Sequence, residues 1–317
     1  MTSSASGTEP GASLSGLLQP RRSGDGSFSL FCQQTGEAFH CAQGALQEAR
    51  RVFVAPSALE RFPPGRLLRV VEVAVGTGTN TAALLEAAAD RKLQLDWWGL
   101  ERDPEPLRLA LADPDFRLQW RPGICEQLQQ LRSAGRLCWG DARLQLPRLL
   151  GTAEGAALVG RCDLVLLDAF SPRRCPQLWS QEFLGALARL LAPEGRLLTY
   201  CSAAAVRQSL QLAGLQLAAI EGSPDGAAWS AGTVASPSDL LMASPLRPLS
   251  VMEAEHIACR AGEPYRDPDG CGSVEQLLAE RAERQGRSSA EPASHWQRRW
   301  GASRRHALGL EGAVASR

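Results

Sequence analysis

The chain has 317 residues, 44% of them hydrophobic, with 34 basic and 34 acidic side chains, a formal net charge of zero and a pI of about 6.9. This length and apolar content suffice for one large or two modest domains with a buried core. The balanced charge excludes a global electrostatic field that would draw the protein to nucleic acid or to a membrane, so any such partner has to be recognised locally.

The cysteines and the first residues indicate where the protein works. The nine cysteines include no Cys-x-x-Cys pair, which argues against a zinc site and against a disulfide framework. We therefore expect no bound metal and a reducing, cytoplasmic environment. Residues 1–25 are rich in Ser, Gly, Ala and Pro and contain no long apolar run. We expect them to be disordered, without a signal peptide, and we expect no membrane partner.

From residue 26 onwards the sequence alternates between strand-like and helix-like segments. Residues 26–66 are expected to form an N-terminal extension on the substrate side, and residues 67–245 a single α/β domain. The expected strands are 68–75, 95–101, 137–139, 162–168, 196–201, 215–221 and 239–244, the last two as an antiparallel pair. The expected helices are 80–90, 104–112, 124–132, 142–150, 180–191 and 203–212. This alternation predicts a doubly wound, mostly parallel seven-stranded sheet with an antiparallel last strand, whose ligand lies at the carboxyl ends of the strands.

The most informative segment joins the first strand of this domain to its first helix. It reads Val-Val-Glu-Val-Ala-Val-Gly-Thr-Gly-Thr-Asn over residues 70–80. Gly76 and Gly78 allow the backbone to approach a ligand closely, and the helix that starts near Asn80 offers unpaired N–H groups. Glu72 could take up a ligand ammonium and would repel a pyrophosphate. The segment therefore favours S-adenosylmethionine (SAM) over a dinucleotide, although such a turn is also common as an ordinary connection.

Three further acids follow strands of the same sheet. Glu101 lies about 20 residues past the glycines, where a carboxylate can accept both hydroxyls of a ribose. Asp141 follows a short strand, at a position where class I methyltransferases commonly contact the adenine amine. Asp168 follows the most apolar strand and would lie beside the transferable methyl group, holding an incoming amine and helping to remove its proton. Glu101 could instead be a solvated strand end, and Asp168 could simply cap loop N–H groups.

These residues carry a resemblance to the methyltransferase domain of the MnmC family, which methylates the aminomethyl group on C5 of the tRNA wobble uridine. The resemblance covers roughly residues 25–245. Its most specific part is Asp-Ala-Phe-Ser-Pro at 168–172 followed by Pro-x-x-Trp at 176–179. The other matching stretches are Phe39-His40, Gly44-Ala45 with Glu48, 72–80, Glu101, Gly140-Asp141 and 199–207.

The resemblance implies a class I SAM-dependent methyltransferase with SAM as co-substrate and tRNA as partner. Asp168 is then the catalytic residue that engages the substrate amine. The implied cofactor-binding residues are Glu72 for the methionine moiety, Gly76, Gly78, Asn80, Glu101 for the ribose and Asp141 for the adenine. The expected substrate-side residues are His40, Glu48, Phe170, Pro172, Arg173, Arg174 and Trp179, with Phe170 and Trp179 shaping the pocket for the uracil.

The sequence departs from the family pattern in two ways. Ala74 stands where the family usually has a glycine, which is acceptable if that position keeps a negative φ. The bifunctional family members also carry a flavin-dependent oxidase domain, and no second Gly-rich strand–helix unit is present here. We therefore expect a form with methyltransferase activity only, without FAD, acting on an aminomethyl uridine that other enzymes supply.

Two other classes of function remain open. A polyamine aminopropyltransferase shares the fold but usually has a second acid three residues after the first in this loop, where this chain has Ser171. A non-catalytic binding module is the other alternative, and calorimetric titration with SAM would identify it by the absence of heat.

The segment 246–317 lies outside the resemblance and is expected to be a helical or disordered basic extension. Short helices are predicted at 253–259 and 274–284, with an extended turn at 264–268. A basic tail follows, with Arg298-Arg299-Trp300 and Arg304-Arg305-His306. Such a tail could touch tRNA phosphates and stack on a base, or it could be a solvated tail. The sequence leaves the oligomeric state open.

Overall fold

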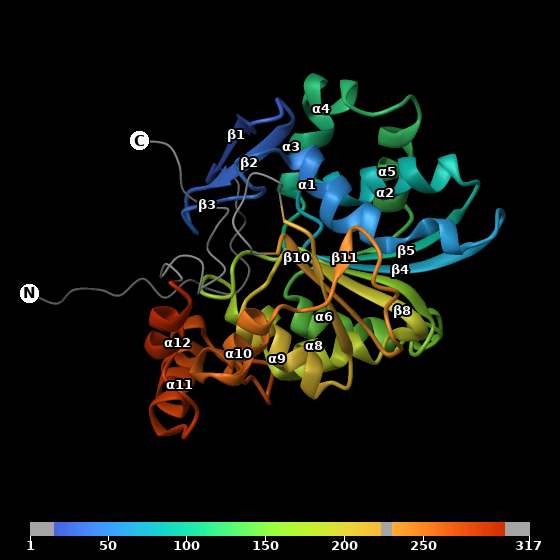
Figure 1. Cartoon of the computed structure of the whole chain (residues 1–317). Coiled ribbons are helices and arrows are strands. Elements are labelled where there is room, and N and C mark those ends of the chain that lie inside the picture. The colour runs from blue at the N-terminus through green and yellow to red at the C-terminus, as the bar shows by residue number, and fades with distance from the viewer. Residues whose placement is uncertain (1–15, 223–229, 302–317) are drawn as a thin grey trace, which may run out of the picture.

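The computed structural model describes residues 16–222 and 230–301. A central sheet carries helices on both faces, a small separate sheet lies near one edge of it, and the C-terminal helices pack beside one helical layer (Figure 1). The predicted doubly wound α/β architecture is confirmed.

The elements have the following bounds. The strands are β1 (Leu18–Arg22), β2 (Phe28–Cys32), β3 (Glu37–Ala38), β4 (Leu67–Val73), β5 (Gln94–Glu101), β6 (Leu137–Trp139), β7 (Cys162–Leu167), β8 (Leu191–Thr199), β9 (Gln216–Ile220), β10 (Gly232–Ser236) and β11 (Leu246–Arg247). The α-helices are α1 (Ala45–Glu48), α2 (Thr79–Asp90), α3 (Glu105–Ala112), α4 (Pro114–Leu118), α5 (Ile124–Ser133), α6 (Ala142–Leu150), α7 (Ala153–Ala156), α8 (Gln181–Ala188), α9 (Ala204–Leu212), α10 (Val251–Ala258), α11 (Val274–Arg287) and α12 (Ala293–Trp300). A π-helix, η1 (Ala49–Val54), and the 3-10 turns η2 (Ala55–Ser57), η3 (Leu59–Arg61), η4 (Pro176–Trp179) and η5 (Arg260–Gly262) complete the set.

The central sheet has eight strands in the order β11-β9-β10-β8-β7-β4-β5-β6. Strands β8, β7, β4, β5 and β6 are parallel, whereas β10 runs antiparallel between β8 and β9. The chain order reverses between β4 and β7, because the chain proceeds outward from β4 through β5 and from β7 through β8. Open α/β sheets bind their ligands at such a switch point, outside the carboxyl ends of the strands.

The central sheet lies buried between two helical layers because its inner strands are apolar on both faces. All six residues of β7 are buried, as a parallel strand covered on both sides requires. Helices α1 to α5 cover one face, and α6, α8 and α9 cover the other (Figure 1). Two hydrophobic clusters fill the space between the sheet and these helical layers. The acids at the ends of the strands lie outside these clusters, at the carboxyl edge of the sheet.

Two predictions about the last strands are wrong. The sheet has eight strands instead of seven, and residues 239–244 form no strand. Strands β10 and β11 run against the parallel strands. The five small residues of β10 are all buried, whereas Pro237 and Pro245 flank the segment predicted as a strand, and proline cannot donate to a sheet ladder. Strand β8 also begins earlier than predicted, at Leu191, and it contains the irregularity that shifts its register against β7.

The N-terminal part of the chain contains a three-stranded sheet of its own. Strand β1 lies within the segment predicted to be disordered, and it pairs with β2 along its whole length. Only the first of its five residues is buried, so it lacks the alternating pattern by which strands are recognised. Residues 1–15 lie outside the described residues. Phe28 packs edge-on against Phe116 of α4, with ring centroids 5.8 Å apart, and this contact seats the small sheet on the helical layer.

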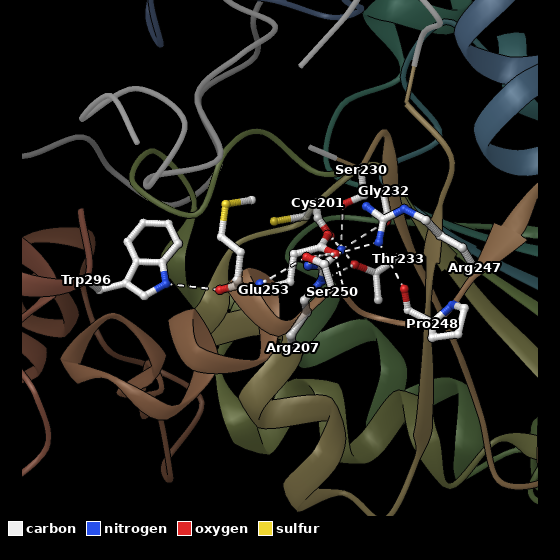
Figure 2. A network of polar contacts seen from close by, with 11 residues as sticks. Cys201, Arg207, Ser230, Gly232, Thr233, Arg247, Pro248, Ser250, Glu253 and Trp296 are labelled. Atoms are coloured by element: carbon white, nitrogen blue, oxygen red, sulfur yellow. Dashed lines mark hydrogen bonds and ion pairs between the residues drawn. The ribbon is translucent and has the colours of Figure 1, made fainter. Parts of the chain in front are cut away.

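A buried ion pair ties the C-terminal segment to the sheet. Nη1 of Arg207, on α9, lies 3.0 Å from Oε1 of Glu253, on α10, and both side chains are almost completely enclosed. Arg207 also donates to Thr233 Oγ1 (2.9 Å) and Ser230 Oγ (2.6 Å). Figure 2 shows Arg207 and Arg247 converging on the Glu253 carboxylate. Because breaking such a pair costs roughly 3–5 kcal/mol, α10 is an integral part of the fold.

The described part of the segment predicted as a basic tail forms a helix. Helix α12 contains Arg298, Arg299 and Trp300, and Arg299 is ion-paired with Glu255 and Glu291 at 2.7 Å each. Its charge is therefore neutralised within the protein. Residues 304–306 lie outside the described residues. Over 16–222 and 230–301, no helix has the length and apolar character that crossing a membrane would need.

Candidate active site

The turn between β4 and α2 needs both of its glycines. Gly76 has a φ of 57° and Gly78 a φ of 78°, a region that side chains disfavour. A Cβ at Gly78 would lie 2.9 Å from Leu107 Cδ1 and Leu128 Cδ2, and a Cβ at Gly76 would lie 3.2 Å from Phe39 Cδ1. Side chains from three parts of the chain thus close around the turn.

Ala74 does not meet the condition under which alanine would be harmless. Its φ is 61°, so it occupies the left-handed region without being a glycine. Its N–H donates to Leu100 O at 2.8 Å, which holds the backbone in this conformation. The left-handed conformation costs an L-residue about 1–2 kcal/mol. The glycine turn therefore carries backbone strain at its first position.

Glu101 ends β5 and braces the same turn. Its Oε2 accepts from the Gly76 N–H (2.8 Å) and its Oε1 from the Asp103 N–H (3.0 Å). Burial raises the pKa of Glu101, against the lowering effect of these backbone hydrogen bonds. Each carboxylate oxygen has a further lone pair, so the predicted contact with a ribose hydroxyl is compatible with this geometry.

Glu72 lies behind the turn and is completely buried. Its Oε2 accepts from Trp97 Nε1 (2.9 Å) and from Thr81 Oγ1 (2.5 Å), while its Oε1 is buried and has no hydrogen-bond partner. Burial raises the pKa of Glu72 to about 7. The Oδ1 of Asn80, in the first turn of α2, is a second buried acceptor without a partner. Because buried polar atoms are normally satisfied, these two acceptors fit a ligand that brings hydrogen-bond donors.

Asp168 stands at the end of β7, directly beside this pair. Its N–H donates to Val73 O (3.1 Å), and its Oδ2 accepts from Asn80 Nδ2 (2.7 Å). The residue is half-buried. Burial raises its pKa well above the usual range, and the charges of Glu48 and Glu72 raise it further, which together outweigh the hydrogen bond from Asn80. A carboxyl group in such surroundings is suited to holding a cation or accepting a proton.

Two aromatic side chains, Trp179 and Tyr200, hold the backbone of the loop after Asp168. Trp179 Nε1 donates to Phe170 O (2.8 Å), and the Tyr200 hydroxyl donates to Ala169 O (2.8 Å). The two rings pack edge-to-face, with centroids 6.1 Å apart. Trp179 has no exposed surface, so in this conformation it supports the loop and offers no wall to a uracil ring. Phe170 is half-buried and can serve that purpose.

The N-terminal sheet contacts the other side of this loop. The Ser171 hydroxyl donates to Glu37 Oε1 (2.6 Å), and the Ser171 N–H donates to Glu37 Oε2 (3.2 Å). Phe39 packs edge-on against Phe170, with centroids 5.3 Å apart, and it also covers Gly76. Glu37 could not be predicted as a functional residue from the sequence, because the two-residue strand β3 has no periodic pattern. Phe39 was within the matching stretches of the family resemblance.

Glu48 and His40, expected on the substrate side, have different surroundings. Glu48 Oε2 accepts from the Cys41 N–H (2.8 Å), and burial raises its pKa. Its charge acts on Asp168, so the two carboxyl groups belong to one electrostatic cluster. His40 is buried against Ser29 (Nδ1 to Oγ, 2.9 Å), and burial lowers its pKa to about 4. His40 is therefore neutral at physiological pH and lies within the extension.

The remaining predicted residues differ in how far they are exposed to solvent. Pro172 is buried, whereas Arg173 and Arg174 are exposed on the same loop. Arg174 Nε lies 3.9 Å from Glu37 Oε1, too far for a direct hydrogen bond. Asp141, the N-cap of α6, accepts from the Arg143 N–H and is ion-paired with the Arg143 guanidinium. In the described part of the chain, no three His, Cys, Asp or Glu side chains are grouped as a metal site would need.

The fold and this site together define a class I SAM-dependent methyltransferase. Residues 120–228 match a family model described as S-adenosyl-L-methionine-dependent methyltransferase. The relatives carry a more specific name, tRNA 5-methylaminomethyl-2-thiouridine biosynthesis bifunctional protein MnmC. The protein of Burkholderia vietnamiensis is 31% identical over 273 residues, which is 79% of this chain and 40% of that protein. That of Pseudomonas paraeruginosa is 32% identical over 258 residues, covering 77% and 39%.

A solved structure gives the same result for the fold. The crystal structure of MnmC2 from Aquifex aeolicus is similar to this chain with a TM-score of 0.69 and 24% sequence identity, over 86% of each chain. The chain is thus an MnmC-like methyltransferase, and the resemblance inferred from the motifs is confirmed. It spans about 40% of the length of the curated relatives that it matches.

Proposed function

We propose that this protein transfers a methyl group from SAM to the primary amine of a 5-aminomethyl group on the wobble (2-thio)uridine of tRNA, which gives the 5-methylaminomethyl product. The relatives named for 5-methylaminomethyl-2-thiouridine biosynthesis support this substrate. The observation that carries the proposal is the half-buried Asp168 carboxyl at the switch point of the sheet, with Asn80 bonded to it and Glu48 and Glu72 around it.

The residues present fit SAM. The buried acceptors without partners, Glu72 Oε1 and Asn80 Oδ1, would receive hydrogen bonds from the ammonium of the methionine moiety. Glu101 would accept from the ribose, and Asp141 from the exocyclic amine of the adenine. SAM supplies a methyl group already activated by its sulfonium charge. The protein therefore has to position the nucleophile and manage a proton, and positioning alone can supply much of a rate enhancement.

Asp168 would do both. Its carboxylate accepts a hydrogen bond from the substrate amine, which directs the nitrogen lone pair toward the methyl carbon. As the N–C bond forms and the S–C bond breaks, the nitrogen gives a proton to Asp168, and the thioether product leaves without charge. A raised pKa suits this task, because a general base works best when its pKa lies near the pH at which the enzyme operates.

The substrate side would be built from the catalytic loop and the N-terminal extension. Phe170 and Phe39 form a partly accessible edge-to-face pair beside Asp168, and a splayed-out pyrimidine could stack there. Arg173 and Arg174 are exposed on the same loop, where they would meet the phosphates that flank the base. This arrangement gives a local basic rim in a protein without net charge.

The decisive experiment is methyl transfer from labelled SAM to tRNA from a strain that lacks this activity, followed by nucleoside mass spectrometry. The proposal expects label in 5-methylaminomethyl uridine and a matching loss of 5-aminomethyl uridine. Label at another nucleoside, or none in tRNA when SAM is bound, would refute the substrate assignment. Failure to bind SAM in calorimetric titration would favour a non-catalytic module. Transfer of an aminopropyl group from decarboxylated SAM to a free polyamine would favour the aminopropyltransferase-like alternative, although Ser171 contacts Glu37 and offers no carboxyl of its own to a dication.

A further inference from the structure

The side chain of Asp141 is fixed by one neighbour. Arg143 Nη2 donates to Asp141 Oδ2 (2.7 Å), and Arg143 Nε is shared between the two Asp141 oxygens (3.1 Å to Oδ2 and 3.2 Å to Oδ1). The Arg143 backbone N–H also donates to Oδ1 (2.9 Å). A guanidinium that engages a carboxylate in this two-pronged way fixes the carboxylate plane as well as its place. About 31% of the Asp141 side chain stays exposed, so it retains surface for a ligand.

Arg143 is in turn held by the C-terminal segment. Its Nη1 donates to Asp267 Oδ2 (2.7 Å) and to Gly272 O (3.0 Å). The Asp267 side chain is 3% exposed and that of Arg143 14%, so this contact is screened from water. Asp267 lies 124 residues beyond Arg143 in the sequence. One guanidinium therefore bridges two carboxylates from distant parts of the chain.

The loop that contains Asp267 is firmly docked. Asp267 Oδ1 accepts from the Gly272 N–H (2.9 Å), which closes the loop, and the Asp267 N–H donates to Glu182 Oε2 (2.8 Å) at the start of α8. The Gln181 N–H donates to Tyr265 O (2.9 Å), two residues earlier in the segment. Residues 265–272 thus lie across the starts of α6 and α8, and each of their anchors belongs to the methyltransferase fold.

We propose that Arg143 is a positioning residue for the cofactor, and that residues 265–272 thereby form part of the cofactor site. An aspartate at a helix N-cap tends to turn its side chain toward its own backbone N–H groups. Arg143 engages both Asp141 oxygens and is itself fixed by Asp267, so the Asp141 carboxylate presents one constant orientation to the exocyclic amine of adenine. The proposal rests on the proposed function only in that Asp141 is the adenine acceptor.

The test compares two ligands that differ at the exocyclic group alone. S-adenosylhomocysteine carries the amine, and S-inosylhomocysteine has an oxygen in its place. Calorimetry should show that the wild-type protein prefers the adenosyl ligand. In Arg143→Gln the Kd of the adenosyl ligand should rise about tenfold, as expected for a charge-assisted hydrogen bond, while that of the inosyl ligand changes less than about twofold. The control is Arg148→Gln, which removes an exposed charge from the same helix and should change neither Kd.

Asp267→Asn keeps the size of the side chain and should reduce the preference in the same direction by a smaller factor. If it reproduces the selective loss with an unchanged melting temperature, the result supports the proposal even where Arg143→Gln folds poorly. An equal loss for both ligands would show that Arg143 acts only on the fold and would overturn the proposal. A wild-type protein that binds both ligands equally well would also overturn the proposal. The same holds if the variants keep the wild-type preference for the adenosyl ligand. A protein that shows the Arg143-dependent preference but leaves tRNA unmethylated would overturn the proposed function and leave this inference standing.

Discussion

Glu37 accepts hydrogen bonds from both the hydroxyl (2.6 Å) and the N–H (3.2 Å) of Ser171, three residues after Asp168. The N-terminal sheet and the loop that follows Asp168 are therefore joined by a nearly buried contact. The same sheet leads into Phe39, which covers the glycine turn. The glycine turn and the loop after Asp168 thus share one support outside the α/β domain.

Replacing Glu37, which holds Ser171, should slow methyl transfer without weakening cofactor binding. In Glu37→Gln the amide oxygen can accept from the Ser171 N–H only while the amide NH2 donates to the Ser171 hydroxyl, so two charge-assisted hydrogen bonds become weaker neutral ones and the loop is held less firmly. We expect kcat to fall roughly tenfold, because small misplacements of reacting groups are costly, while the Kd of S-adenosylhomocysteine changes less than about twofold. Glu60→Gln, at an exposed position of η3, is the control. An unchanged kcat in Glu37→Gln would show that the loop keeps its position unaided.

Asp168→Asn should separate binding from chemistry. The asparagine can still accept from Asn80 through its Oδ1, so the loop geometry should persist. The basic carboxylate is lost, and removal of a general base commonly costs about 10²- to 10⁴-fold in rate. Single-turnover methyl transfer and calorimetry on the same sample measure the two effects. Full activity in this variant would remove Asp168 from the catalytic role, and a lost SAM affinity would assign it to the cofactor instead.

The parallel sheet explains why much of the site could be predicted. Glu101 ends one parallel strand and Asp168 follows another, and the carboxyl ends of parallel strands meet at one edge, so their place at the same edge follows from the pattern alone. The partners that orient them follow no such pattern. Asp267 and Arg143 are 124 residues apart, and Glu37 and Ser171 are 134 apart. Such contacts depend on how separate segments dock, which local periodicity does not encode.

The errors in the fold have the same origin. Strand β10 is short and made of small residues, and the more hydrophobic segment 239–244 looked more like a strand than β10 did. The positive φ of Ala74 likewise could not be predicted from its residue type, since alanine adopts a positive φ only when the surrounding structure imposes it. Trp179 belongs to a sequence motif that predicted a substrate-side role, yet its ring is enclosed. A motif residue can support the loop from the protein interior, as Trp179 does through its hydrogen bond to Phe170 O, without contacting a ligand.

Glu72 should make the stability of the ligand-free protein depend on pH. Its pKa is raised by burial from 4.5 to about 7. Below pH 4.5 the carboxyl is protonated in both the folded and the unfolded chain, so it contributes nothing. As the pH rises toward 7 the unfolded chain releases the proton first, and the folded state loses stability, by on the order of 3 kcal/mol above pH 7. In Glu72→Gln this loss should be absent.

Urea unfolding of both proteins at pH 5 and pH 8 measures this effect together with the influence of Glu72 on Asp168, because the titrating groups that Glu72 does not act on cancel in the difference between wild type and variant. The wild type should lose stability relative to Glu72→Gln between the two pH values. A ligand ammonium should favour the ionised carboxyl, so the affinity for S-adenosylhomocysteine should rise with pH in the wild type and less so in the variant. A pH-independent difference in stability would mean that Glu72 stays ionised in its buried site.

Ala74→Gly should relieve the strain in the cofactor turn. The left-handed conformation costs alanine about 1–2 kcal/mol, and the greater freedom of glycine in the unfolded chain offsets roughly 0.5–1 kcal/mol of that. We expect a net gain of up to about 1 kcal/mol in the free energy of unfolding. The control is Ala89→Gly, an exposed position within α2, where the same change should cost about 1 kcal/mol. The opposite signs at two alanines fifteen residues apart would identify backbone conformation as the cause. A loss of stability at both positions would show that packing of the Ala74 methyl against the strands beneath it outweighs the strain.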